Sequence, residues 1–326
     1  HGQWSVFEKY SKLLYLPLFV VGFRDPKIRH AALHAFLLAM LITAVLLVIK
    51  ALGMMHYGGD DPGKMFRNHI MTGYMLALAV YIALVYAQKS QGMLRAAYGA
   101  LVLLLSYTVI FIGTGRMAYV AYVVVMSVWF FQLMTWRKAL LFVSGFCMLF
   151  AVSYAVNPTM QFLVHQAEDD WVSYQHNQKN TSLGLRLQFH TYAFELFKRH
   201  PWVGNGTGSF SYLMKREMPV QGWTAAQAWE PHSQYWLIAA EFGVLGLGLL
   251  GLFFGSLLWG SLKLGAMRGM SVAVLLVFFM GSLTDSLLLY SGTGYLFLLF
   301  TALCFASHPN RVESKEENII REYVLS

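Results

Sequence analysis

Long runs of apolar residues, separated by short polar stretches, dominate the chain from residue 30 onward. A transmembrane helix needs about 20 predominantly apolar residues to cross the hydrocarbon core of a bilayer. Eight runs approach this length, at 30–53, 68–87, 93–113, 116–134, 138–156, 233–259, 270–288 and 291–307. The pattern therefore predicts an all-α polytopic membrane protein.

The composition supports this prediction. Hydrophobic residues make up 57% of the 326 positions and charged residues only 12%, which excludes an ordinary soluble domain. The two cysteines, Cys147 and Cys304, both fall inside predicted spans and are interpreted as small apolar packing residues.

Basic residues are concentrated in alternate connections, and the positive-inside rule assigns these connections to the cytoplasm. They are Arg24, Lys27, Arg29, Lys89, Arg95, Arg137, Lys138, Lys263 and Arg268. The opposite side, periplasmic or extracellular, then holds 54–67, the 113–116 turn, 157–232 and the turn near 285–292. The net charge of +8 is largely this topological signal, so nucleic acid is not an expected partner.

The predicted organisation has four parts. Residues 1–156 form a transmembrane bundle of five spans, preceded by a helix that is too short to span comfortably and is expected at the cytoplasmic interface. Residues 157–232 form a large periplasmic helical segment, and residues 233–307 form three further spans. Residues 308–326 are expected to be a cytoplasmic tail.

The 157–232 segment holds most of the polar chemistry. Apolar residues at helical spacing predict a helix over 183–199 that lies across the top of the bundle. The stretch "GNGTGSF" at 204–210 follows, and its glycines allow the backbone to approach a ligand or another segment closely. Both plain loop geometry and phosphate binding by Gly204 and Gly206 fit this turn.

The spacing of two motifs resembles the family of bacterial O-antigen ligases and their polymerase relatives. Arg186 precedes "HPWVGNGTGSF", and "PHSQYWLIAAEFGVLG" contains His232 and Ser233, the nine residues 234–242, and then a Gly-x-x-Gly. The resemblance covers the second half of the chain well and residues 1–110 only through topology.

An earlier element, "IGTGRMAYVAY", resembles the family's turn into a span. Arg116 matches the arginine of that turn, whereas Gly115 and Met117 replace the usual serine and glycine. These two departures weaken this single motif.

The resemblance implies a helical bundle like that of C-type glycosyltransferases, with the active site on the periplasmic face of a Gram-negative inner membrane. It implies a donor glycan linked to a polyprenyl diphosphate such as undecaprenyl diphosphate, and the lipid A core oligosaccharide as acceptor. It further implies an inverting transfer that needs neither a metal nor a cofactor.

Three residues are predicted to be catalytic, because topology places all of them on the exterior side. Arg116 and Arg186 carry planar guanidinium groups that bind phosphate oxygens in bidentate fashion, so two arginines suit a diphosphate. His232 suits a general base, because a neutral imidazole accepts a proton near neutral pH. Structural alternatives are an interfacial anchor for Arg116, a solvated helix surface for Arg186 and helix capping at His232.

Three further residues are candidates for substrate binding. Arg67 and His69 begin the second span on the exterior side, where they fit either a basic wall for the substrate or an interfacial anchor. Glu241 lies about 13 Å deeper than His232 on the same helix. An ionisable residue inside a span indicates function by default, although Glu241 also fits a role in helix packing.

Two acidic pairs, Asp60 with Asp61 and Asp169 with Asp170, lie on the exterior side. Many membrane glycosyltransferases of the C-type fold bind a divalent cation with such acids. Because the resemblance implies a metal-independent reaction, both pairs are interpreted as solvated loop charges.

Other functions remain open. A protein O-oligosaccharyltransferase or an O-antigen polymerase would use the same donor with another acceptor, and the short segment after residue 307 favours the ligase modestly. A lipid or glycan transporter would also be polytopic, but paired halves with broken helices are not visible in the sequence.

Overall fold

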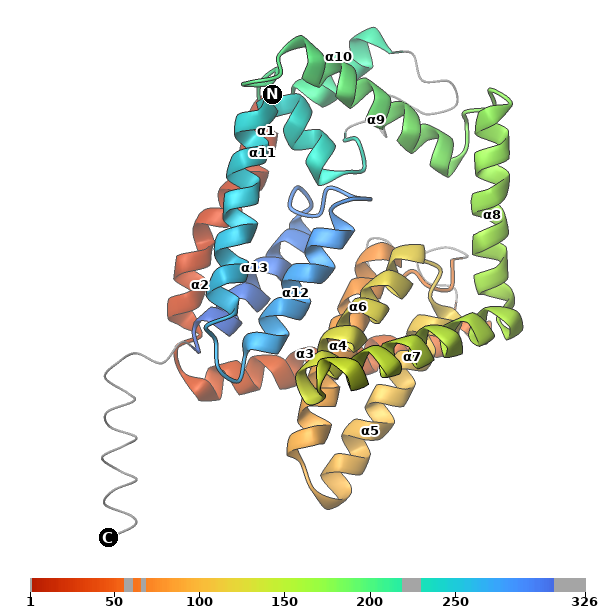
Figure 1. Cartoon of the computed structure of the whole chain (residues 1–326), viewed down its shortest axis with the longest axis vertical. Coiled ribbons are helices and arrows are strands. Elements are labelled where there is room, and N and C mark those ends of the chain that lie inside the picture. The colour runs from red at the N-terminus through yellow and green to blue at the C-terminus, as the bar shows by residue number, and fades with distance from the viewer. Residues whose placement is uncertain (1, 56–60, 66–68, 219–229, 308–326) are drawn as a thin grey trace.

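The structure is a computed structural model that describes residues 2–55, 61–65, 69–218 and 230–307. Every regular element in these ranges is a helix. The helices pack into a bundle, with a group of helices across one end of it (Figure 1). The all-α prediction is therefore confirmed for the described part of the chain.

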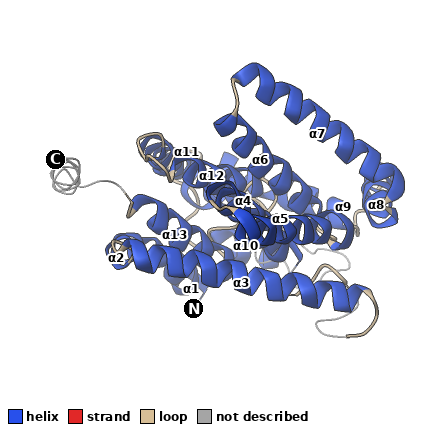
Figure 2. Cartoon of the chain, turned by 90° about the horizontal axis from the view of Figure 1, so that it is seen from below, coloured by secondary structure: helices blue, strands red, loops and turns tan. Residues whose placement is uncertain are grey.

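Six helices are long and apolar enough to cross a membrane, which confirms a polytopic membrane protein. They are α3 (Pro26–Ala51), α4 (His69–Lys89), α5 with its terminal π-helical turn η2 (Gly92–Ile112), α6 (Arg116–Leu133), α7 (Trp136–Val156) and α11 (Gln234–Ser261). Two shorter apolar helices, α12 (Arg268–Gly281) and α13 (Ser291–Phe305), complete the bundle. One core of buried apolar side chains runs through these helices, while α7 lies at the periphery (Figure 2).

The predicted span 270–288 is wrong in its extent. Helix α12 ends at Gly281, and residues 282–290 form a turn that leads into α13. The sequence here is "SLTDS", and short polar side chains compete with the helix for backbone hydrogen bonds. Asp285 therefore lies in a turn instead of a membrane helix.

Contacts between helix termini show which termini lie together at each end of the bundle. At one end, which we call the site end, the backbone N–H of Gln234 at the start of α11 donates to the carbonyl of Ser282 after α12. At the opposite end, the hydroxyls of Ser261 and Ser271 lie 2.6 Å apart where α11 ends and α12 begins. Helices α4 and α6 also begin at the site end, since Tyr74 on α4 approaches Gly281. The helices thus alternate in direction.

The N-terminal segment departs from the expectation of a helix at the cytoplasmic interface. It forms α1 (Gly2–Ser11), η1 (Lys12–Tyr15) and α2 (Leu16–Gly22) in succession. Tyr10 hydrogen-bonds Gln234 at the site end, whereas Arg29, just after this segment, donates to the carbonyl of Ala306 at the opposite end. The segment is corrected to one that runs the length of the bundle, because three short helical pieces together are long enough to do so.

The segment between the two groups of spans forms α8 (Pro158–Gln175), α9 (Ser182–Arg199) and α10 (Ser209–Glu217). The predicted 183–199 helix is confirmed as α9, and its apolar face packs on α11 through Phe189, Leu196 and Leu237. Figure 1 shows α9 and α10 across the site end, with α8 rising toward them from the end of α7.

Candidate active site

His232 lies immediately before α11, but it does not cap this helix. Ser233 is the N-cap residue, and its hydroxyl accepts a hydrogen bond from the backbone N–H of Trp236 at 3.4 Å. The backbone of His232 has a φ of 52°, which is uncommon for a residue other than glycine. Helix capping, the structural alternative considered for His232, is therefore the role of Ser233. The imidazole of His232 is available for another role.

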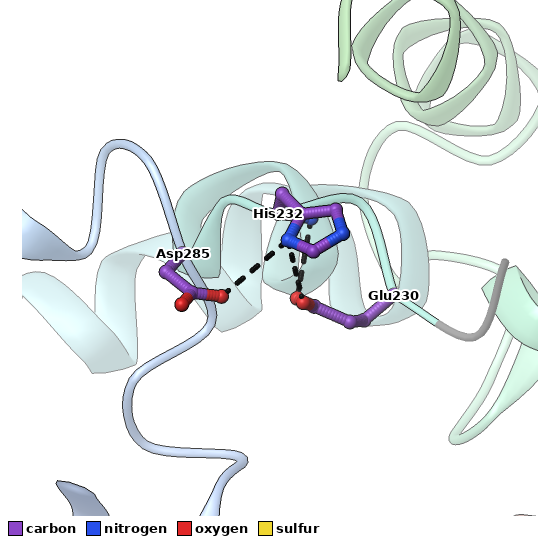
Figure 3. A group of neighbouring side chains, drawn as sticks. All are labelled: Glu230, His232 and Asp285. Atoms are coloured by element: carbon purple, nitrogen blue, oxygen red, sulfur yellow. Dashed lines mark hydrogen bonds and ion pairs between the residues drawn. The ribbon is translucent and has the colours of Figure 1, made fainter. Parts of the chain in front are cut away.

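Two buried carboxylates lie beside the same nitrogen of the imidazole (Figure 3). Glu230 Oε1 is 3.1 Å from His232 Nδ1, and Asp285 Oδ1 is 3.6 Å from it. Glu230 is 0% exposed and Asp285 2% exposed. Because carboxylates accept hydrogen bonds, this arrangement favours a proton on Nδ1 and leaves Nε2 as the basic nitrogen.

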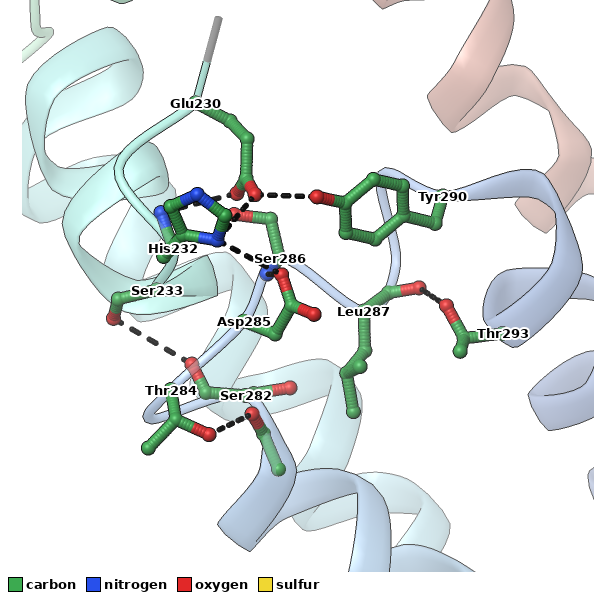
Figure 4. A network of polar contacts seen from close by, with 11 residues as sticks. Glu230, His232, Ser233, Ser282, Thr284, Asp285, Ser286, Leu287, Tyr290 and Thr293 are labelled. Atoms are coloured by element: carbon green, nitrogen blue, oxygen red, sulfur yellow. Dashed lines mark hydrogen bonds and ion pairs between the residues drawn. The ribbon is translucent and has the colours of Figure 1, made fainter. Parts of the chain in front are cut away.

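Further hydrogen bonds hold Glu230 in place. Its Oε1 accepts a hydrogen bond from the Tyr290 hydroxyl at 2.6 Å, and its Oε2 accepts one from the backbone N–H of His232 at 3.2 Å (Figure 4). Burial raises the pKa of Glu230, the positive charge on His232 opposes this shift, and the negative charge of Asp285 adds to it. The cluster thus brings an imidazole and two carboxylates into contact.

Side chains from α11 and from the N-terminal segment form hydrogen bonds with the turn at 282–290. The side chain of Gln234 accepts a hydrogen bond from the backbone N–H of Leu288 at 3.0 Å and donates one to the Tyr10 hydroxyl at 2.8 Å. Lys12, which is 3% exposed, donates to the carbonyl of Tyr290 at 2.8 Å. The N-terminal segment therefore supports the turn that carries Asp285.

Helix α9 covers the imidazole and brings Arg186 to the same end of the bundle. The ring of Phe189 stacks on His232 with 6.2 Å between ring centroids. His190 lies near the backbone of His232, and burial is the main cause of the lowered pKa of His190. Arg186 lies one turn before His190, so both are on the same helix face. Tyr74 on α4 is within electrostatic reach of both Arg186 and Asp285, which links the two groups of charges.

Arg116 is the first residue of α6 at the site end. Its guanidinium donates to the side-chain oxygen of Gln166 on α8 at 3.1 Å. Arg116 also interacts electrostatically with Asp170 and with Arg186. The two arginines are thus within electrostatic reach of each other.

The predicted residue His69 lies beside the turn that precedes Arg116, because its ring would contact a side chain placed at Gly115. Its Nδ1 is 2.9 Å from Asp61 Oδ2, and Asp61 Oδ1 accepts a hydrogen bond from the Thr114 hydroxyl at 2.6 Å. Arg67 and Asp60 lie outside the described residues.

The interpretation of the acidic pairs as solvated loop charges is wrong for Asp61 and Asp170. Burial alone would raise the pKa of Asp61, but hydrogen bonds from His69, Thr114 and the backbone outweigh it and lower this pKa to about 2. Asp170 is 8% exposed, and its carboxylate accepts a hydrogen bond from the backbone N–H of Leu183 at the start of α9. Asp169 is exposed, as expected. Both corrected residues hold backbone segments together.

Gly204 and Gly206 contact the backbone of α11. A side chain at Gly204 would collide with the backbone of Glu241, and the N–H of Gly206 donates to the Glu241 carbonyl at 2.9 Å. Helix α11 is kinked here, because Gly243 has a φ of 62°. The N–H of Val244, freed by the kink, donates to the carbonyl of Pro201 at 2.8 Å. This geometry supports the loop interpretation of the glycine-rich turn.

Glu241 is buried beneath the same turn. Its carboxylate lies near the backbone N–H groups of Gly208 and Phe210 at the start of α10, and its Oε2 is buried without a hydrogen-bond partner among the described residues. An acidic side chain is favourable at a helix N-terminus because the free N–H groups carry partial positive charge. These contacts support the packing alternative for Glu241.

The structure thus brings Arg116, Arg186 and His232 to one end of the bundle, whereas Glu241 lies deeper on α11, beneath the glycine-rich turn. Glu230, His232 and Asp285 also form a group whose ligand atoms lie within 4.8 Å of one another, so they are the described residues best placed to hold a metal ion. The same short contacts equally fit a proton shared between an imidazole and two carboxylates.

Sequence reasoning missed Glu230 and Asp285. A signal existed for Asp285, because an acidic residue inside a predicted span is a functional hypothesis by default. Glu230 is two residues before His232 and carries no comparable signal. Its position became evident only from its burial and its contact with Tyr290.

Comparison with known proteins bears on this site. Residues 99–251 match the sequence profile of the family Wzy_C, described as O-antigen ligase. No curated protein matched the chain in the corresponding search. The matched region contains Arg116, Arg186 and His232, whereas Asp285 lies beyond it. Residues 99–251 are therefore similar to the O-antigen ligase family, which supports a membrane glycosyltransferase of the O-antigen ligase or polymerase type.

Proposed function

We propose that the protein is an O-antigen ligase, which transfers a glycan from a polyprenyl-diphosphate-linked donor to the lipid A core oligosaccharide. The reaction takes place on the periplasmic face of the bacterial inner membrane. The observation that carries this proposal is the imidazole of His232, with two buried carboxylates beside its Nδ1, at the end of the bundle to which α6 and α9 bring Arg116 and Arg186.

In the proposed reaction, His232 acts as general base. A hydroxyl oxygen of the acceptor attacks the anomeric carbon of the donor sugar, and its proton passes to Nε2 of His232. Glu230 and Asp285 stabilise the imidazolium that forms, because their negative charges lie beside Nδ1. A short distance between a base and its carboxylate partners also keeps the ring in one orientation.

Arg116 and Arg186 bind the diphosphate of the donor. The bond between the anomeric carbon and the diphosphate oxygen breaks as the acceptor oxygen bonds, so the configuration inverts and the diphosphate leaves with the electron pair. Negative charge on the leaving group increases in the transition state, and fixed guanidinium groups stabilise it most strongly at that point. This electrostatic role does not require a metal ion.

The direct test is a transfer assay with purified protein, a polyprenyl-diphosphate-linked glycan and lipid A core. We expect a product of higher mass that retains the lipid A core, with inverted anomeric configuration by NMR. An acceptor panel that adds a second donor molecule and an acceptor protein separates the alternatives. Transfer only to the second donor would make the protein a polymerase, and transfer only to protein would make it a protein O-oligosaccharyltransferase.

A further inference from the structure

Lys12 in η1 is a buried lysine whose ammonium group binds the backbone of a distant turn. Its Nζ donates to the carbonyl of Tyr290 at 2.8 Å and, at 3.4 Å, to that of Leu289. Among the described residues, no carboxylate forms an ion pair with Lys12. Burial of an unpaired charge costs free energy, and an apolar side chain of similar length would avoid this cost. The bonds that the ammonium group donates therefore explain this lysine better than packing does.

The start of α13 fits closely around the end of the Lys12 side chain. A side chain at Gly294 would collide with Lys12 Nζ, and the ring centroid of Tyr295 is 5.8 Å from Nζ. The carbonyl of Tyr290 also accepts a hydrogen bond from the backbone N–H of Gly294 at 2.9 Å. The backbone of Tyr290 is therefore held by η1 on one side and by α13 on the other.

The side chain of Tyr290 reaches the cluster around His232 (Figure 4). Its hydroxyl donates to Glu230 Oε1 at 2.6 Å, and the same oxygen is 3.1 Å from His232 Nδ1. The side chain of a tyrosine adopts few rotamers, so the position of its backbone limits where its hydroxyl can lie. A shift of the Tyr290 backbone would thus move the hydroxyl away from Glu230.

Tyr10 provides a second link between the N-terminal segment and this turn. Its hydroxyl accepts a hydrogen bond from the side chain of Gln234, which in turn accepts one from the backbone N–H of Leu288. This link ends two residues before Tyr290, whereas Lys12 bonds Tyr290 itself. Of the two links, the one from Lys12 leads more directly to Glu230.

We propose that Lys12 is a positioning residue for the general base. Lys12 holds Tyr290, Tyr290 holds Glu230, and Glu230 keeps the imidazole of His232 oriented so that Nε2 meets the acceptor hydroxyl. The inference rests on the proposed function, which gives His232 the role of base. Because Lys12 acts through the base and not through the diphosphate, its loss lowers turnover and leaves donor binding unchanged.

The test uses Lys12→Met, which keeps a side chain of similar length and removes its hydrogen bonds. Lys50→Met is the matched control, because Lys50 is also buried and donates to two backbone carbonyls, those of Asp61 and Lys64. The transfer assay gives kcat and the KM for the donor, and elution as a single monodisperse peak in detergent checks the fold. If Lys12→Met fails this check, the milder substitution Lys12→Gln takes its place.

We expect Lys12→Met to lower kcat about tenfold, with a KM for the donor within about twofold of wild type. Lys50→Met should keep the wild-type kcat. A wild-type kcat in Lys12→Met overturns the proposal, and so does an equal fall of kcat in Lys50→Met.

A double-mutant cycle tests the route through Tyr290. Tyr290→Phe removes the hydroxyl alone, and its kcat should also fall about tenfold. If Lys12 acts through this hydroxyl, the double variant should show about the same tenfold fall. Independent effects would instead multiply to about a hundredfold fall, which would overturn the proposed route.

An NMR measurement gives a result that does not depend on activity. Isotopically labelled imidazole nitrogens report the tautomer of His232, whose signals are identified by their loss in His232→Gln. We expect a proton on Nδ1 in the wild type and in Lys50→Met, and a mixture of tautomers in Lys12→Met. A single tautomer with the proton on Nδ1 in Lys12→Met contradicts the proposal. If the wild-type protein transfers glycan to no acceptor, the proposed function fails, while the NMR spectra still decide whether Lys12 positions the ring.

Discussion

The two charged regions of the site are built differently. Around His232, the buried carboxylates of Glu230 and Asp285 and the Tyr290 hydroxyl are linked by contacts of 2.6 to 3.6 Å. Arg116 has one hydrogen bond, to Gln166, and among the described residues Arg186 has no hydrogen bond or ion pair. The imidazole of His232 is thus oriented by contacts within the protein, whereas the donors of the arginines remain available for oxygens of a ligand.

This difference has a physical reason. A base acts efficiently only when its ring is fixed relative to the hydroxyl it deprotonates, so hydrogen bonds within the protein are an advantage there. An arginine that already satisfied all its donors would have to lose those bonds before it bound phosphate. Substitutions around His232 should therefore affect turnover, whereas substitutions of the arginines should also affect donor binding.

The largest effect is expected for His232→Ala. Loss of a general base typically lowers turnover by about 10²- to 10⁴-fold, and donor affinity should remain near that of wild type. Turnover in the transfer assay and donor binding by calorimetry are the measurements. Ser233→Ala is the control, because it removes the helix cap and should lower the thermal stability while leaving the chemistry in place. Near-normal turnover of His232→Ala would contradict the role of base.

The next effect is expected for Arg186→Lys. The charge remains but the planar fork is lost, so kcat/KM should fall about 10- to 100-fold and donor affinity should fall with it. Arg199→Lys on the same helix is the matched control, since Arg199 is exposed and pairs with Glu217 at 2.8 Å. Wild-type kinetics in Arg186→Lys would exclude a bidentate contact with phosphate.

A smaller effect, about tenfold on kcat, is expected for Glu230→Gln and for Asp285→Asn. Because burial raises the pKa of Glu230, protonation of this carboxylate should contribute to the loss of wild-type activity at acid pH, so Glu230→Gln should change the acid limb of the pH–rate profile. Profiles from pH 5 to 8 are the measurement, and an acid limb that stays in place in both variants would indicate a purely structural role.

The smallest effect is expected for removal of divalent cations. If the arginines stabilise the leaving diphosphate, transfer should persist in EDTA at the wild-type rate. Abolition by EDTA with recovery on addition of magnesium, manganese or zinc would convert Glu230, His232 and Asp285 from a base and its partners into metal ligands. That outcome would also remove the contrast between the two regions.

The sequence alone predicted the class of protein, most of the helices and three residues of the candidate site. Apolar runs of span length predict membrane helices because the bilayer requires them, and the spacing around Arg186 and His232 indicates the family. These features are local, so they can be predicted without knowledge of the packing. They also placed Arg116, Arg186 and His232 on the same side of the membrane.

Only the tertiary structure decided which side chains surround the base. Glu230 and Asp285 are 55 positions apart in the numbering but meet at His232, because α12 ends early and its turn folds against the start of α11. In the same way, Lys12 reaches Tyr290 from a segment whose length alone indicated an interfacial helix. Contacts between distant segments depend on where helices end and pack, and hydrophobic periodicity carries no information about them.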